Sequence, residues 1–230
     1  MDSVKLDWAA PSLMCLDFLD TRAQLETIAR RAVWAHTDVM DGRFAPNLTL
    51  TPDLIRAFRR VTDLPLDAHL MTVEPALWIE RFAEAGATAI TLHRETIDNN
   101  AFRLFDRIEA LGCLPGLALC PATTIASAKH LLCRARILTI MTVDIGYAGS
   151  PFIPQMLAKI EEARAFKERE GLDFVIQIDG GCGKRTFKML KDAGAERFVL
   201  GSSLFGRAEA EDGLDAAFDA IAREYNDELR

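Results

Sequence analysis

The stretch WAHTDVMDGRFAPN, residues 34–47, joins a β-like run to a polar segment that begins at Asp41. His36 and Asp38 lie two positions apart, so on a strand both side chains project from the same face. A carboxylate on a buried face is costly unless it is paired or bound to a metal. The stretch therefore predicts a strand with a functional site near its carboxyl end. We expect Asp41, just past that end, to hold the following loop through backbone hydrogen bonds.

Seven further β-like runs accompany this one along the chain. The eight runs are PSLMCL (11–16), VWAHTDVM (33–40), LPLDAHLM (64–71), ATAITLH (87–93), LPGLALC (114–120), RILTIMTV (136–143), DFVIQID (173–179) and ERFVLGS (196–202). Their starts lie about 20 to 40 residues apart, which leaves room for a helix after each strand. No Pro-, Gly- or Ser-rich linker divides the chain, so the pattern predicts an α/β fold, a single (β/α)8 TIM barrel over residues 1–230. A doubly wound open sheet is the alternative, but its Gly-rich first turn is missing from PSLMCLD.

Helix start and stop signals occupy the intervals between these runs. Thr51 is a candidate N-cap, and Pro52 after it suits the first helical position. Amphipathic segments end at Gly86, Gly171 and Gly194, each directly before a β-like run. These signals support the alternation of strands and helices.

The composition excludes several classes of function. The chain is 50% hydrophobic and 27% charged, with a formal net charge of −7 and no basic cluster, so neither a nucleic acid nor a membrane is an expected partner. It has no apolar run long enough for a membrane span, and its first ten residues do not resemble a signal peptide. Five dispersed cysteines without a CxxC pair argue against a disulfide framework and a thiolate zinc site, so a cytoplasmic location is expected.

Polar side chains gather at the predicted carboxyl ends of the strands, where barrels of this kind place their functional groups. His36 and Asp38 lie near the end of the second strand and His69 near the end of the third, while His93 and Asp179 end the fourth and seventh. Two imidazoles and two carboxylates suit Zn²⁺, Fe²⁺, Mn²⁺ or Co²⁺, and the spacing does not choose among them. Asp38 and Asp179 are also placed to act as acid and base on the two faces of one carbon.

Three glycine-containing loops follow the last three strands: DIGYAGS (144–150), DGGCG (179–183) and GSS (201–203). Glycine lets backbone amides approach an anion closely, and the loops after strands seven and eight are the usual phosphate site of this barrel. Plain turns are the alternative for each loop taken alone. Metal on one side and phosphate on the other predict a phosphorylated sugar, held at both ends while one carbon is inverted through an enediolate.

These residues resemble those of a known family. The segments APSL, HTDVMDGRFAPN, LPLDAHLM, ITLH, MTVDIGYAGSPFIPQMLAKI, IDGG and GSSLFG, in this order between about residues 10 and 207, closely resemble the ribulose-phosphate 3-epimerases. The resemblance implies an isomerase that inverts carbon 3 of a ketose phosphate. It also implies one divalent metal per chain, with zinc expected ahead of iron, manganese or cobalt, and a homo-oligomer.

The resemblance further implies roles for individual residues. The metal ligands are His36, Asp38, His69 and Asp179. Asp38 and Asp179 are the acid and the base. Substrate contacts come from strand ends and the glycine loops: Ser12, His69, Gly146, Tyr147, Ala148, Gly149, Asp179, Gly180, Gly181, Gly201, Ser202 and Ser203. Three methionines surround the reaction centre: Met40, Met71 and Met141.

A narrower likeness concerns the sugar. The segments PSLMCLD, NLTLTP, ITLHRETI, AFRLFDRI and KEREGLDF resemble D-allulose-6-phosphate 3-epimerases more than the pentose-phosphate enzymes. We therefore expect conversion of D-allulose 6-phosphate to D-fructose 6-phosphate ahead of D-ribulose 5-phosphate to D-xylulose 5-phosphate. Ile145 and Ser150 depart from the family's usual Pro and Gln, so the loop that carries them loses a fixed φ angle. A non-catalytic sugar-phosphate binding protein is an alternative of another class, but it would not need both aspartates.

Overall fold

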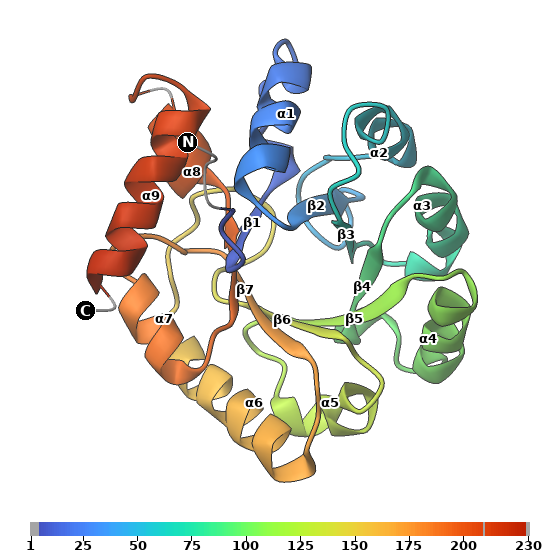
Figure 1. Ribbon diagram of the computed structural model, residues 1–230. Coiled ribbons are helices and arrows are strands. Elements are labelled where there is room, and N and C mark those ends of the chain that lie inside the picture. Colours follow the sequence, from blue (N-terminus) through green and yellow to red (C-terminus); the bar gives the residue numbers. More distant parts are fainter. Residues whose placement is uncertain (1–4, 209, 229–230) are drawn as a thin grey trace.

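Eight short parallel strands form the centre of the computed structural model, which describes residues 5–208 and 210–228 (Figure 1). The strands are β1 (Ala9–Pro11), β2 (Ala35–Met40), β3 (Leu66–Met71), β4 (Ala89–His93), β5 (Leu114–Leu119), β6 (Ile137–Met141), β7 (Val175–Asp179) and β8 (Arg197–Leu200). Consecutive strands pair from β2 to β8, and β8 pairs with β1. A bridge between Ser12 and His36 brings β1 against β2, so the barrel is nearly closed. The predicted (β/α)8 barrel is confirmed.

Helices surround the strands on the outside (Figure 1). They are α1 (Thr21–Arg31), α2 (Pro52–Phe58), α3 (Ile79–Ala85), α4 (Ala101–Ala110), α5 (Ile125–Leu132), α6 (Met156–Glu170), α7 (Phe187–Ala193), α8 (Ser202–Ala208) and α9 (Leu214–Glu228), with short 3₁₀ turns η1 (Leu13–Cys15), η2 (Pro75–Leu77) and η3 (Arg94–Thr96). The predicted helix stops are confirmed, because Gly86, Gly171 and Gly194 follow α3, α6 and α7 with φ of 104°, 62° and 122°. Among the described residues, no helix has both the length and the apolar character needed to cross a bilayer.

The first strand differs from its predicted bounds. The run 11–16 was expected to be extended, but the strand covers Ala9–Pro11 and residues 13–15 form the 3₁₀ turn η1. The Cys15 amide donates to the Ser12 carbonyl at 3.1 Å, which closes this turn. A short apolar run fits a strand or a helical turn equally well by periodicity alone. Ser12 consequently lies just past the end of β1.

A carboxylate is buried in the middle of the barrel, where apolar layers are usual. Asp67 of β3 has no exposed surface. It accepts hydrogen bonds from the Thr91 hydroxyl at 2.6 Å and from the Gln177 amide at 3.1 Å. Gly116 of β5 lies opposite Thr91, and a Cβ at this position would be 2.0 Å from the Thr91 hydroxyl oxygen. Glycine at position 116 therefore leaves the space that the Thr91 hydroxyl occupies.

The substitution Gly116→Ala should lower the free energy of unfolding by about 1–3 kcal/mol, because the added methyl overpacks the barrel and displaces Thr91 from Asp67. Urea denaturation followed by circular dichroism measures the change. Gly206→Ala on α8 is the matched control, since its Cβ would have no neighbour within 4 Å. A loss for Gly116→Ala within about 0.5 kcal/mol of the control would contradict this account.

Candidate active site

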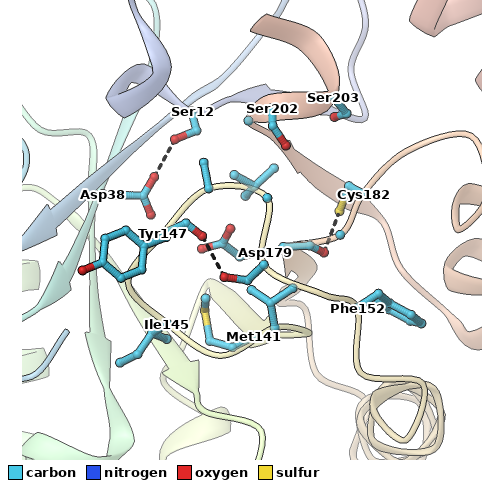
Figure 2. Close-up of a pocket in the computed structure, with 18 of the residues that line it drawn as sticks. Ser12, Asp38, Met141, Ile145, Tyr147, Phe152, Asp179, Cys182, Ser202 and Ser203 are labelled. Carbon is cyan, nitrogen blue, oxygen red and sulfur yellow. Dashed lines mark hydrogen bonds between the residues drawn. The ribbon is translucent and has the colours of Figure 1, made fainter. Parts of the chain in front are cut away.

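A cavity of about 430 Å³ opens at the carboxyl ends of the strands (Figure 2). Its volume lies in the range of small-molecule sites. It is lined by Ser12, Asp38, the three predicted methionines, the loop 144–152, the loop 179–186 and residues 201–203. Every predicted substrate contact except His69 therefore lines this cavity. His69 and His36 have no exposed surface and lie beneath it.

Four side chains from three strands converge below the cavity and are called the ligand cluster: His36, Asp38, His69 and Asp179. Their candidate ligand atoms all lie within 4.8 Å of one another. The Nε2 atom of His36 lies 3.2 Å from a carboxylate oxygen of Asp38 and 3.6 Å from one of Asp179. The Nδ1 atom of His69 is 3.5 Å from each of these two carboxylates. The structure thus brings together the four residues predicted as metal ligands.

Hydrogen bonds from outside the cluster orient two of its members. The Ser12 hydroxyl donates to Asp38 at 2.5 Å (Figure 2). On the other side, the Nδ1 atom of His36 lies 3.2 Å from the carboxylate of Asp67. A histidine whose second nitrogen is held by a carboxylate has a fixed ring orientation, which is a common arrangement behind metal ligands.

The electrostatics of the ligand cluster favour added positive charge. Burial alone would lower the pKa of His36, but the nearby carboxylates, with Asp38 foremost, raise it well above its usual value. The pKa of His69 is also raised, because hydrogen bonds with Asp179 and Asp38 outweigh its burial. Burial would raise the pKa of Asp38, yet the neighbouring His36 and His69 hold it well below its usual range. These buried carboxylates require a compensating cation or protons on the imidazoles.

The donor set fits a divalent metal. Two imidazole nitrogens and two carboxylates are borderline and hard ligands of the kind that bind Zn²⁺, Fe²⁺, Mn²⁺ and Co²⁺. Cys15 also lines the cavity, but burial and the charges of Asp38 and Asp179 raise the pKa of its thiol to about 12. Cys15 is also not among the residues whose ligand atoms converge, so it is not an expected metal ligand.

Asp41, the second aspartate of the stretch 34–47, holds the loop after β2. One carboxylate oxygen accepts from the Arg43 and Phe44 amides at 2.9 Å, and the other accepts from the Val73 amide at 2.8 Å. The prediction for Asp41 is confirmed. It fastens the loop after β2 to the segment after β3.

The loop after β6 is fastened to the same region. The Asn47 side chain donates to the Gly146 carbonyl at 2.9 Å, and the Tyr147 hydroxyl donates to the Pro46 carbonyl at 2.6 Å. Ile145 packs against the cluster of Met40, Ala45 and Met71. The family's usual Pro is absent at position 145, but these contacts between the two loops restrain the backbone that Pro would have restrained.

The glycine loops after β7 and β8 lie across the cavity from Asp38, with Ser202 and Ser203 on their side (Figure 2). The Thr186 hydroxyl accepts from the Gly183 amide at 3.0 Å and donates to the Gly181 carbonyl at 2.6 Å. Lys184 and Arg185 also line the cavity and were not predicted. They could have been predicted from the sequence, because they directly follow the glycine loop DGGCG. They add positive charge beside the backbone amides of these loops.

The three methionines predicted around the reaction centre are buried in the cavity wall. Their thioethers give this part of the wall an apolar, polarisable lining. His93, the other histidine at a strand end, lies outside the ligand cluster. Its Nε2 atom is 2.9 Å from Nε2 of His69, and its Nδ1 atom is 3.1 Å from Glu95.

Comparison with known proteins agrees with this geometry. Residues 8–205 match the ribulose-phosphate 3 epimerase family. The chain belongs to this family. The resemblance inferred from the motifs is thus confirmed, and so is the expected enzyme class, an epimerase of carbohydrate phosphates within the isomerases.

Individual relatives cover nearly the whole epimerase. The cytoplasmic isoform of ribulose-phosphate 3-epimerase from Oryza sativa subsp. japonica is 36% identical over 221 residues, 94% of this chain and 95% of the relative. Ribulose-phosphate 3-epimerase from Bacillus subtilis is 36% identical over 202 residues, 87% and 93% of the two chains. The structure of a 3-hexulose-6-phosphate synthase superposes with a TM-score of 0.63 at 17% identity, covering 99% of this chain and 98% of the other, which supports the barrel fold alone.

We expect the epimerase to carry one divalent metal ion per chain. Dialysis against a strong chelator should remove both the ion and the activity, and addition of Zn²⁺, Fe²⁺, Mn²⁺ or Co²⁺ should restore them. Elemental analysis and an activity assay measure the two quantities. His36→Ala should lose the ion because it removes one of four expected ligands. His130, which is exposed on α5, gives the control variant His130→Ala, which should keep the ion. Full turnover by metal-free enzyme, or a normal metal content in His36→Ala, would contradict the assignment.

Proposed function

We propose that the enzyme interconverts D-ribulose 5-phosphate and D-xylulose 5-phosphate by inverting carbon 3. The observation that carries the proposal is that two carboxylates, Asp38 and Asp179, line the same cavity as three glycine loops. The relatives described above are ribulose-phosphate 3-epimerases, which favours the pentose over the hexose expected from the segment likeness. D-Allulose 6-phosphate has the same carbon 2 carbonyl and carbon 3 hydroxyl, so it is the substrate for comparison.

The two aspartates are proposed to act as the acid and the base. The hydrogen on carbon 3 is acidic because carbon 2 is a carbonyl, and the resulting negative charge is shared with the carbonyl oxygen. Asp38 comes from β2 and Asp179 from β7, so the two carboxylates reach the ligand cluster from separate strands. One removes the proton from one face of carbon 3 and the other delivers a proton to the opposite face. Ser12 holds Asp38 in place through its 2.5 Å hydrogen bond.

The ligand cluster is proposed to hold the divalent metal, with zinc ahead of iron, manganese or cobalt. When bound, the metal supplies positive charge that stabilises the developing oxyanion at carbon 2. Asp38 and Asp179 have both roles, since their carboxylates bind the metal and carry protons. His36 and His69 bind only through nitrogen and are fully buried beneath the cavity that the two carboxylates line.

The phosphate is proposed to bind at the glycine loops. The expected donors are the backbone amides of Gly180, Gly181 and Gly201, together with those of Ser202 and Ser203. Gly146 to Gly149 and the side chains of Lys184 and Arg185 complete that end of the cavity. Met40, Met71 and Met141 keep the reaction centre apolar. A cytoplasmic location and a homo-oligomeric state stay predictions.

Asp38→Asn and Asp179→Asn should each lower kcat by about 10²–10⁴-fold, because each removes a proton carrier. Metal content is measured in every variant, since the same substitutions weaken a metal ligand. Asp212→Asn, on an exposed turn, is the control and should leave kcat unchanged. A variant that retains its metal and near wild-type kcat would exclude that aspartate as acid or base.

The kcat/KM for D-ribulose 5-phosphate should exceed that for D-allulose 6-phosphate by about 10- to 200-fold, the usual effect of one misfitting carbon unit. Coupled assays with both sugars give the ratio. D-Ribulose without its phosphate should be a far poorer substrate, because it leaves the glycine loops empty. The opposite order of the two phosphates would assign the enzyme to the hexose, and equal values for free and phosphorylated ribulose would reject the phosphate site.

A further inference from the structure

We propose that Glu95 and His93 form a hydrogen-bond relay that fixes the tautomer of His69, so that Nδ1 of His69 carries the lone pair needed to bind the metal. Glu95, His93 and His69 are called the relay. Glu95 and His93 are positioning residues, since neither lines the cavity. The inference rests on the proposed metal role of the ligand cluster.

The relay is a continuous line of contacts that leads away from the ligand cluster. Nδ1 of His69 faces Asp38 and Asp179, and Nε2 of the same ring lies 2.9 Å from Nε2 of His93. Nδ1 of His93 lies 3.1 Å from a carboxylate oxygen of Glu95, in the turn η3 after β4. The contacts thus run from the ligand cluster through the two imidazole rings to the Glu95 carboxylate.

Glu95 sets the direction of these hydrogen bonds. Its other carboxylate oxygen accepts from the Cys120 amide at 2.9 Å and from the Thr123 hydroxyl. The oxygen that faces His93 accepts as well, so Nδ1 of His93 must donate, and in a neutral ring its Nε2 must then accept. Nε2 of His69 consequently donates, which leaves the lone pair of His69 on Nδ1. That atom is the one directed into the ligand cluster.

Burial and ring contacts hold both imidazoles in the orientation that these hydrogen bonds require. His69 and His93 have no exposed surface, so water does not replace either partner. Their rings are stacked with centroids 4.9 Å apart, and the Phe44 ring lies 4.7 Å from His93 on the loop that Asp41 holds. Rotation of either imidazole would break contacts on both sides. Outside the ligand cluster, Nδ1 of His93 contacts the Glu95 carboxylate at 3.1 Å and the Cys120 sulfur at 3.5 Å. The carboxylate is much the stronger acceptor, so Glu95 determines the tautomer.

A second group of residues beside the relay could also hold a metal. The candidate ligand atoms of His93, Glu95 and Cys120 lie within 4.8 Å of one another. A metal there would need the lone pair of His93 Nδ1, which would place the proton on Nε2 and reverse the relay. The two sites therefore exclude each other, and the relay assigns His93 and Glu95 to the support of His69.

The test uses full-length enzyme with Zn²⁺ as the probe. In Glu95→Gln the carbonyl keeps the contacts to Cys120 and Thr123, while the amide group presents hydrogens to His93 and reverses the relay. The affinity for Zn²⁺, measured by competition with a chelator, should fall about 10–100-fold. Glu84→Gln, exposed on α3, is the control and should bind Zn²⁺ as wild type does. Equal melting temperatures of the metal-free proteins would show that the fold is intact.

Nitrogen-15 NMR of zinc-loaded wild type tests the relay without any variant. Protons on Nε2 of His69 and Nδ1 of His93 are expected. Protons at the other positions, a second Zn²⁺ on His93, or wild-type affinity in Glu95→Gln would overturn the relay. None of these measurements depends on turnover. Full activity of metal-free wild type would instead refute the proposed metal function and leave these readouts unaffected.

Discussion

The buried carboxylate of Asp67 is the constraint around which this site is built. Removing a carboxylate from water costs several kcal/mol, which only good partners offset. Here the partners are Thr91, Gln177 and His36, from β4, β7 and β2. Because Nδ1 of His36 is directed to Asp67, its Nε2 is directed to the ligand cluster. One carboxylate thus links four strands and orients one of the expected metal ligands.

The site combines a rigid floor with a separately supported rim. The floor consists of strand residues whose imidazoles are each backed by a carboxylate, Asp67 behind His36 and, through His93, Glu95 behind His69. The rim consists of loops that hold one another through Asn47 and Tyr147. They also contact strand residues, since the Thr49 hydroxyl donates to the Asp38 carbonyl and Ile145 packs on Met40. Under the proposed function, the chemistry at carbon 3 depends on the floor, whereas the length of sugar that fits depends on the rim. This division explains why one set of motifs is compatible with both a pentose and a hexose phosphate.

Much of the fold and cluster followed from local rules, and the misses have physical causes. Period-two placement found His36 and Asp38, and glycine signals found the helix ends. The run 11–16 was misassigned because short apolar segments fit two structures. The role of Asp67 could in principle have been predicted, since it lies two residues before His69 on the same strand face. The contribution of Glu95 could not have been predicted, because the direction of a hydrogen bond between histidines depends on partners in the loop after β5 that sequence spacing does not reveal.

The partners of Asp67 are far apart in the chain, with Gln177 110 residues beyond it. During synthesis from the N-terminus, the first half of the barrel is complete long before β7 exists. Until β7 is made, Asp67 lacks the Gln177 amide and has only Thr91 and His36 as partners, so its burial is incompletely compensated. Half-barrels are thereby disfavoured as stable products, and closure is made cooperative with the last strands. We therefore expect the group that orients the active site also to couple folding of the first strands to the presence of β7.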